Sequence, residues 1–173
     1  MNQSRKIIFA ALFAVVFSSV VAVDEGRGRG NNEQIGSVTN KVYIKECGAC
    51  HLAFQPQLLP KRSWEKIMGT LDKHFGDSAT LDEAAAAEIL AYLVKYSAET
   101  SSSEESIKIL ASLGKSETPL RISDTPYFKR KHRKLNADVF KRKSIGSPAN
   151  CSGCHLTAEK GDYDEDNVKI PKK

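Results

Sequence analysis

The sequence predicts a mainly α-helical protein of two small parts, of which the second is poor in regular structure. Three observations support this prediction. Apolar residues recur at helical spacing in several segments before residue 114. Residues 115–150 contain three prolines and no long amphipathic period. The motif C-x-x-C-H occurs twice, with its two copies about 100 residues apart, so that each part holds one copy.

The N-terminus has the pattern of a secretory signal peptide. Arg5 and Lys6 precede an apolar run of about eleven residues, and small residues follow up to Ala22. A spanning helix needs roughly 20 apolar residues, so a membrane anchor is the weaker alternative. We therefore expect cleavage after Ala22, a periplasmic mature protein and no stable membrane insertion.

The first part is expected to contain helices on both sides of a proline-rich crossing. A short helix should run from about Val38 into Cys47. Two prolines in LAFQPQLLP, residues 52–60, predict a non-helical crossing. Apolar residues then recur at helical spacing over residues 63–75, and Gly76 is a good helix terminator.

The remaining elements become shorter along the chain. Thr80 and Glu83 have the spacing of a capping box before an alanine-rich helix. Residues 104–114 predict one more short helix, and mostly loop is expected over 115–150. The predicted divisions are a signal peptide over 1–22, a flexible leader over 23–36, an N-terminal domain over 37–100 and a C-terminal domain over 101–173.

The charge of the chain argues against nucleic acid as a partner. Its formal charge is +5 from 26 basic and 21 acidic residues, and cleavage after Ala22 would remove two basic and no acidic residues, leaving +3. A net charge this small does not predict a polyanionic partner. Residues 128–143 do hold eight Lys and Arg, but export would separate them from nucleic acid.

The four cysteines form two pairs of identical spacing, each followed directly by a histidine. Two thiols at this spacing match the two vinyl groups of one porphyrin, and the next histidine can supply an axial nitrogen to the iron. The sequence therefore predicts two covalently attached haem c groups. The residues predicted to bind them are Cys47, Cys50, His51, Cys151, Cys154 and His155.

Disulfides, zinc and dithiol chemistry account less well for the cysteine pairs. Two disulfides are the ordinary expectation for four cysteines in an exported protein. Zinc ribbons place their pairs about 15–20 residues apart, and a thioredoxin-like motif needs a βαβ context. Histidine accounts for 4 of 173 residues, so its presence after both pairs by chance has a probability on the order of 1 in 2,000.

The two remaining histidines, His74 and His132, can complete the coordination of two irons. His74 lies on the apolar side of the helix expected over 63–75. Met68 lies on the same apolar side of this helix. Core packing is its expected role, and iron ligation is the alternative. His132 precedes the second motif by about twenty residues, which allows a loop to pass around the haem. The predicted metal ligands are His51, His74, His132 and His155.

The C-terminal segment GDYDEDNVKIPKK superficially resembles a calcium loop. Asp162, Asp164 and Asp166 alternate, but the EF-hand glycine is absent and the twelfth position is Lys173 instead of glutamate. A solvated acidic surface, or a surface for partner docking, is therefore expected.

The ordered blocks ECGACH, LLPKRSW, KHFGDSATL, TPYFKRKH and CSGCHLTAEKGDYDEDNVKIP resemble the dihaem cytochrome c family of exported bacterial electron carriers. The resemblance covers about residues 38–171. It implies a class-I-like cytochrome c N-terminal haem domain and a small, loop-rich C-terminal haem domain. It also implies bis-histidine ligation, with His51 and His74 on the first haem and His155 and His132 on the second.

The predicted function is electron transfer between redox proteins by two low-spin haems, without catalytic residues. The resemblance suggests a small oxygen-binding cytochrome c or a membrane cytochrome b as partner, and we expect a monomer. The alternative is a dihaem peroxidase or reductase with one open iron. A third hypothesis, a haem sensor or binding module, would need a ligand-exchange step or an output domain, and no output domain is visible in the sequence.

Overall fold

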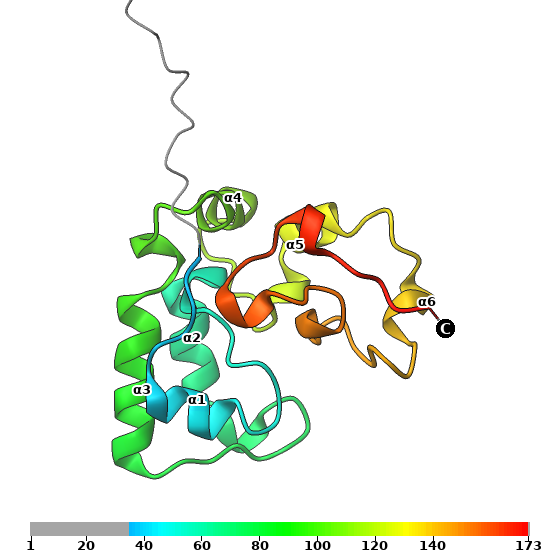
Figure 1. Ribbon diagram of the computed structural model, residues 1–173. Helices are drawn as coiled ribbons and strands as arrows, with labels where there is room; N and C mark the ends of the chain where they lie inside the picture. Colours follow the sequence, from blue (N-terminus) through cyan, green and yellow to red (C-terminus); the bar gives the residue numbers. More distant parts are fainter. Residues whose placement is uncertain (1–34, 173) are drawn as a thin grey trace, which may run out of the picture. The chain divides into compact units, whose positions relative to one another are not determined.

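The computed structural model describes residues 35–172, which are helical with no β-strand in that range (Figure 1). The predicted signal peptide and residues 23–34 of the leader lie outside the described residues. No helix within the described range is long and apolar enough to span a bilayer. The α-helices are α1 (Lys41–Cys47), α2 (Lys61–Met68), α3 (Glu83–Lys95), α4 (Glu104–Ser112), α5 (Pro126–Lys131) and α6 (Ala137–Phe140).

Helices α1, α2 and α3 enclose the larger of two apolar clusters. The Asn40 side chain caps α1 by accepting a hydrogen bond from the Tyr43 N–H, so the helix begins later than expected. Asn40 also donates a hydrogen bond to Glu88 of α3. The buried members of this cluster are Tyr43, Ala53, Leu59, Trp64, Ile89 and Leu93.

The crossing between α1 and α2 is non-helical except for one 3₁₀ turn, Pro56–Leu58, as its prolines predict. The Trp64 indole N–H donates to the Pro56 carbonyl at 2.8 Å, and the Tyr43 hydroxyl donates to the Phe54 carbonyl at 2.9 Å. The Tyr43 bond satisfies the Phe54 carbonyl, which no helix pairs. The Trp64 bond adds to the hydrogen bond that the Pro56 carbonyl accepts from the Leu59 N–H in the 3₁₀ turn. Both bonds fix the segment that follows the first C-x-x-C-H motif.

The helix expected over residues 63–75 is shorter than predicted. It begins directly after Pro60 and ends at Met68, with Gly69 as its C-cap. Glycine is a poor helix former, and the Thr70 hydroxyl donates to the Lys66 carbonyl at 2.9 Å, which competes with helix continuation. His74 therefore follows a 3₁₀ turn, Leu71–Lys73, instead of lying in the last turn of a helix.

Helix α3 starts at a different cap from the one expected. Asp82 accepts a hydrogen bond from the Ala85 N–H and is the N-cap, whereas the Thr80 hydroxyl bonds to Ser78. The negative charge of an aspartate at this position is also stabilised by the positive, N-terminal end of the helix dipole. Ile89 and Leu93 of α3 are buried, whereas Tyr96, which follows the helix as its C-cap, is exposed.

The second part consists mostly of turns, as predicted, but it contains the short helices α5 and α6. Thr125 caps α5 by accepting from the Phe128 N–H, and its own hydroxyl donates to the Ile122 carbonyl. Asn136 caps α6 through the Asp138 N–H. These local caps define short helices that the hydrophobic period did not indicate.

A smaller apolar cluster joins segments from both sides of residue 100. Its buried members are Ile35, Leu58 and Ile109, and Ile122, Tyr127 and Tyr163 pack against them. All described residues belong to one compact unit, Asn31–Lys173. The division into domains at residue 100 stays a prediction.

The acidic C-terminal segment forms turns over the second motif. Asp162 accepts hydrogen bonds from the Asp164 N–H and from Asn167, and Asp164 accepts one from the Asp166 N–H. The alternating aspartates therefore act as local turn caps. The Lys169 N–H donates to the Cys154 carbonyl at 2.8 Å, so this segment is part of the second site and not only a solvated surface.

Candidate haem sites

The first motif begins at the C-terminal end of α1, which presents Cys47 beside the larger apolar cluster. Nδ1–H of His51 donates to the Leu52 carbonyl at 2.7 Å, which leaves Nε2 as the nitrogen able to bind a metal. The His51 ring stacks on Phe54 with centroids 5.1 Å apart. His51 is thus oriented by residues within the same short loop.

The 3₁₀ turn after α2 brings His74 opposite His51. The two ring centroids are 6.1 Å apart and the ring planes are inclined by 20°. Burial, followed by the neighbouring His51 and Arg121, lowers the pKa of His74. A lowered pKa favours the neutral imidazole that a metal ligand requires.

The second motif is held in a 3₁₀ turn, Cys151–Gly153, by the side chain of Asn150. Its amide oxygen accepts from the Gly153 N–H, and its NH₂ group donates to the Ile145 carbonyl at 2.9 Å. Asn150 thereby closes the turn on both sides. This turn sets the spacing of Cys151 and Cys154.

No disulfide joins any two of the four cysteines, all of which lie in the described range, so the disulfide interpretation has no support. Burial raises the pKa of Cys47 to about 11 and that of Cys151 to about 11. Zinc binds cysteine as the thiolate, a form that burial disfavours for these two side chains. No group of three or more Cys, His, Asp or Glu side chains within residues 35–172 converges to form a metal cluster.

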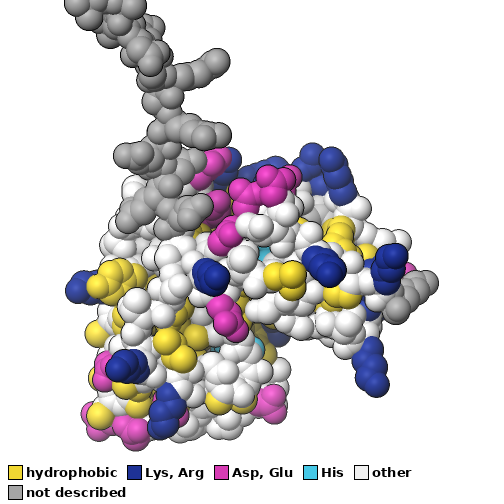
Figure 2. Space-filling model, in the orientation of Figure 1, with side chains coloured by type: hydrophobic (Ala, Val, Ile, Leu, Met, Phe, Trp, Pro, Cys, Tyr) yellow, Lys and Arg dark blue, Asp and Glu magenta, His cyan; other side chains and the backbone are white. Residues whose placement is uncertain are grey.

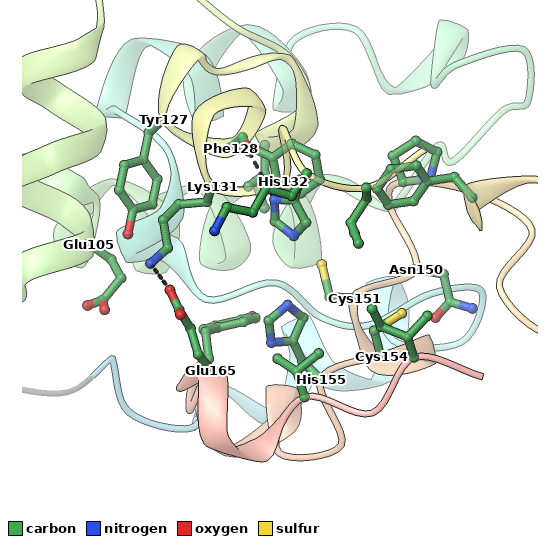
Figure 3. Close-up of a pocket in the computed structure, with 18 of the residues that line it drawn as sticks. Glu105, Tyr127, Phe128, Lys131, His132, Asn150, Cys151, Cys154, His155 and Glu165 are labelled. Carbon is green, nitrogen blue, oxygen red and sulfur yellow. Dashed lines mark hydrogen bonds and ion pairs between the residues drawn. The ribbon is translucent and has the colours of Figure 1, made fainter. Parts of the chain in front are cut away.

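His132 lies opposite His155 across a cavity (Figure 3). The two ring centroids are again 6.1 Å apart, but the planes are inclined by 70°. Nδ1–H of His132 donates to the Phe128 carbonyl at 2.9 Å, which leaves its Nε2 available. Burial, followed by the neighbouring His132, lowers the pKa of His155.

The cavity between these rings has a volume of about 840 Å³. Cofactor pockets in proteins typically measure about 300–1,000 Å³. Both Cys151 and Cys154 line it, as do four apolar residues that lie close to His132 in the sequence. These four are Tyr127, Phe128, Leu135 and Phe140, whereas Val139 is buried elsewhere.

The basic run around His132 does not make the cavity positively charged. Three basic side chains line it, Lys131, Arg133 and Lys134, but so do four acidic ones. The acidic residues are Glu105, Asp164, Glu165 and Asp166. Lys131 pairs with Glu165 at 2.6 Å, and the face drawn in Figure 2 likewise shows acidic side chains among the basic ones.

The ring separation in both pairs tests whether these residues fit an axially ligated iron. Two imidazoles that bind one metal from opposite sides through bonds of about 2.0–2.1 Å have ring centroids about 6 Å apart. Both pairs meet this condition at 6.1 Å. The second pair also encloses a cavity bordered by the two thiols of its motif.

Comparison with known proteins identifies the family. Residues 43–163 match the family model described as dihaem cytochrome c. The chain belongs to the dihaem cytochrome c family. It is a haem-based electron-transfer protein with two covalently attached haem c groups.

Solved structures of this family resemble the chain over most of its length. A diheme cytochrome c from Rhodobacter sphaeroides is 40% identical, with 74% of this chain and 99% of that chain covered and a TM-score of 0.67. A diheme c-type cytochrome from Shewanella baltica is 37% identical, with coverage of 76% and 93% and a TM-score of 0.63. No curated protein sequence matches the chain.

In this dihaem cytochrome c, Gln55 and Tyr163 connect the segments that follow the two C-x-x-C-H motifs. The sequence did not indicate this role for either residue. Gln55 is fully buried, and its NH₂ group donates to the Ala158 carbonyl at 2.7 Å. Its amide oxygen accepts from the Tyr163 hydroxyl at 2.6 Å. Tyr163 in turn packs against the His155 ring, with centroids 5.4 Å apart. Nothing local to Gln55 or Tyr163 indicates a bond over 108 residues.

A Gln55→Leu variant is expected to lose about 1–3 kcal/mol of stability, because it leaves the Tyr163 hydroxyl without its partner and removes one of the two hydrogen bonds to the Ala158 carbonyl. Urea unfolding followed by far-UV circular dichroism measures this loss. Gln57→Leu is the matched control, since the buried amide oxygen of Gln57 has no partner among the described residues. Equal losses in the two variants would contradict a structural role for the Gln55 bonds.

Proposed function

We propose that this dihaem cytochrome c is an exported electron carrier in which both irons have two histidine ligands. The observation that carries the proposal is the equal separation of the two ring pairs, 6.1 Å in each. An enzyme of the peroxidase or reductase type needs an open iron site for its substrate. Two complete histidine pairs favour the carrier.

The proposed roles follow from the geometry of each pair. Cys47 and Cys50 would hold the first haem, with His51 and His74 as its axial ligands. The second haem would be held by the matching residues of its own site, which are Cys151, Cys154, His155 and His132. The pairing of rings supports this assignment over a crossed one, in which His74 would serve the second haem.

Haem iron supplies the one-electron change between ferrous and ferric states. The side chains around it keep the ligands in place during that change. Hydrogen bonds from Nδ1 to main-chain carbonyls orient His51 and His132. Apolar residues such as Phe128 and Phe140 exclude water from the second cavity. A site with both axial positions filled and little freedom to move suits transfer of electrons without binding of substrate.

Export to the periplasm and redox-protein partners are also part of the proposal. The basic, apolar and small-residue order before Ala22 supports export. A small oxygen-binding cytochrome c or a membrane cytochrome b would suit this carrier as a partner. Mixed charge at the rim of the second cavity suits weak, transient docking. We propose a monomeric protein that binds no nucleic acid.

Removal of either His74 or His132 is expected to leave one of the two haem irons with an open coordination position. The His74→Ala and His132→Ala variants should each convert one of two haems to a high-spin ferric form that binds cyanide, and that binds carbon monoxide when reduced. Optical and low-temperature electron paramagnetic resonance spectra measure the change. The unmodified protein should be purely low-spin and should bind neither cyanide nor carbon monoxide.

Met68→Leu is the matched control, because Met68 packs against the apolar cluster near the first site. This variant should keep both haems low-spin. A high-spin haem in Met68→Leu would identify Met68 as a ligand, and a substantial high-spin fraction in the unmodified protein would favour the enzyme. If either histidine variant left both haems unchanged, the corresponding ligand assignment would be wrong.

A further inference from the structure

The two histidine pairs differ in the angle between their rings. His51 and His74 are inclined by 20°, which is close to parallel, whereas His132 and His155 are inclined by 70°, which is close to perpendicular. We propose that side chains of this protein hold the axial histidines nearly parallel on the first haem and nearly perpendicular on the second, which makes the two haems electronically inequivalent. The inference rests on the bis-histidine ligation proposed above.

Local contacts set the parallel pair. The His51 ring stacks on Phe54 at an interplanar angle of 24°, in addition to its Nδ1 hydrogen bond. The His74 ring meets Phe75 edge-on, with centroids 4.9 Å apart. Phe75 has a φ of 56°, and the Arg121 guanidinium lies 4.0 Å from its ring centroid. Each ring of this pair is thus held by an aromatic neighbour.

Phe128 holds the plane of His132 through two contacts. The Phe128 ring stacks on His132 with centroids 3.9 Å apart and an angle of 20°. The Phe128 carbonyl also accepts the hydrogen bond from Nδ1 of His132. Stacking and hydrogen bond together leave the His132 ring little freedom to rotate.

The plane of His155 is fixed differently. Nδ1 of His155 is buried and has no hydrogen-bond partner among residues 35–172. Its ring instead packs at 65° against Tyr163, whose hydroxyl is bound to the fully buried Gln55. Tyr163, held by Gln55, is therefore a positioning residue for His155, and Phe128 is the positioning residue for His132.

Ring orientation matters because an imidazole donates π electrons through an orbital perpendicular to its plane. Two parallel rings donate to the same iron d orbital and split it from its partner, whereas perpendicular rings donate to both and leave them nearly equal in energy. Axial ligands are among the means by which a protein tunes haem electronics. Parallel ligands give a rhombic low-spin ferric signal, and perpendicular ligands give a signal dominated by one large g value.

The same splitting influences the order of reduction. Parallel donation raises the energy of the orbital that holds the unpaired electron, which stabilises the ferric state. The second haem is therefore expected to accept an electron before the first. The large-g signal should disappear first in a reductive titration, and the opposite order would overturn this part of the inference.

Low-temperature electron paramagnetic resonance of the intact ferric protein is the first test. The expected spectrum contains one rhombic and one large-g low-spin signal in equal amounts. His132→Ala should abolish the large-g signal, and His74→Ala should abolish the rhombic one. Two low-spin signals of the same type would overturn the inference and leave bis-histidine ligation intact. A high-spin haem in the unmodified protein would overturn both.

Variants of Tyr163 and Phe128 test what holds the rings. Tyr163→Leu should lose the large-g signal and keep the rhombic one, whereas Tyr163→Phe, which retains the ring, should keep both. Tyr96→Leu is the matched control, because Tyr96 is exposed and packs on Tyr92, away from the histidines. Phe128→Leu should change the large-g signal independently of Tyr163. An unchanged large-g signal in both leucine variants would overturn the positioning roles.

Discussion

A Cys151→Ala/Cys154→Ala variant is expected to carry one haem and to lose the ordered structure of the second part of the chain. Of the thirteen buried hydrophobic side chains in the described range, only Val139, Ile145 and Ala158 follow residue 115. A domain with so few buried side chains depends on another stabilising group, and a large cofactor can take that role. The cavity of about 840 Å³ would otherwise remain unfilled.

Intact mass gives the haem content of this variant, and far-UV circular dichroism gives its helix content. The unmodified protein should have the mass of a chain that begins at Val23 plus two haems. Ser152→Ala is the control, since it changes the same motif, keeps both cysteines and replaces an exposed side chain. A native-like far-UV spectrum for the double variant would show that the second part does not need its haem.

A Gly161→Ala variant is expected to lose about 2–5 kcal/mol of stability. Gly161 has a φ of 74°, and the left-handed region costs about 1–2 kcal/mol for other residues. A Cβ at this position would also lie 1.7 Å from the Ile35 carbonyl oxygen and 2.7 Å from the Gly36 oxygen. Relief of this clash must move the backbone next to Ile35, a buried member of the smaller cluster.

Gly146→Ala separates the two contributions. Gly146 has a similar φ of 79°, but a Cβ there would meet nothing within 4 Å. Only the conformational cost of about 1–2 kcal/mol is expected for this control. Urea unfolding of both variants with their haems attached provides the comparison. Equal losses would mean that the close approach of Gly161 to the Ile35 carbonyl does not matter.

The helices before residue 114 were predictable because a local signal specifies each of them. The helices expected over about 38–47, after Thr80 and over 104–114 correspond to α1, α3 and α4 to within a few residues, although the cap expected for α3 was wrong. The prediction was wrong over residues 69–75, where the apolar period continues although the helix has ended. Gly69 and the Thr70 hydroxyl end helix α2 locally. A hydrophobic period depends only on where apolar residues recur, so it does not reveal either effect. Helices α5 and α6 were missed because they are too short to show a period.

The sequence alone determined the cofactor chemistry. Two C-x-x-C-H motifs indicate two covalent haems because the spacing of the thiols and the histidine is local and matches the porphyrin. It also determined that four histidines are present for two irons. These conclusions need no tertiary structure, since they depend on residue type and on distances along the chain.

Only the tertiary structure decided how these residues meet. It brought His74 opposite His51 and His132 opposite His155, and it gave the two pairs different ring angles. It also joined Gln55 to Tyr163 across 108 residues. Side-chain orientation depends on packing between segments that are distant in sequence, and neither composition nor periodicity contains that information.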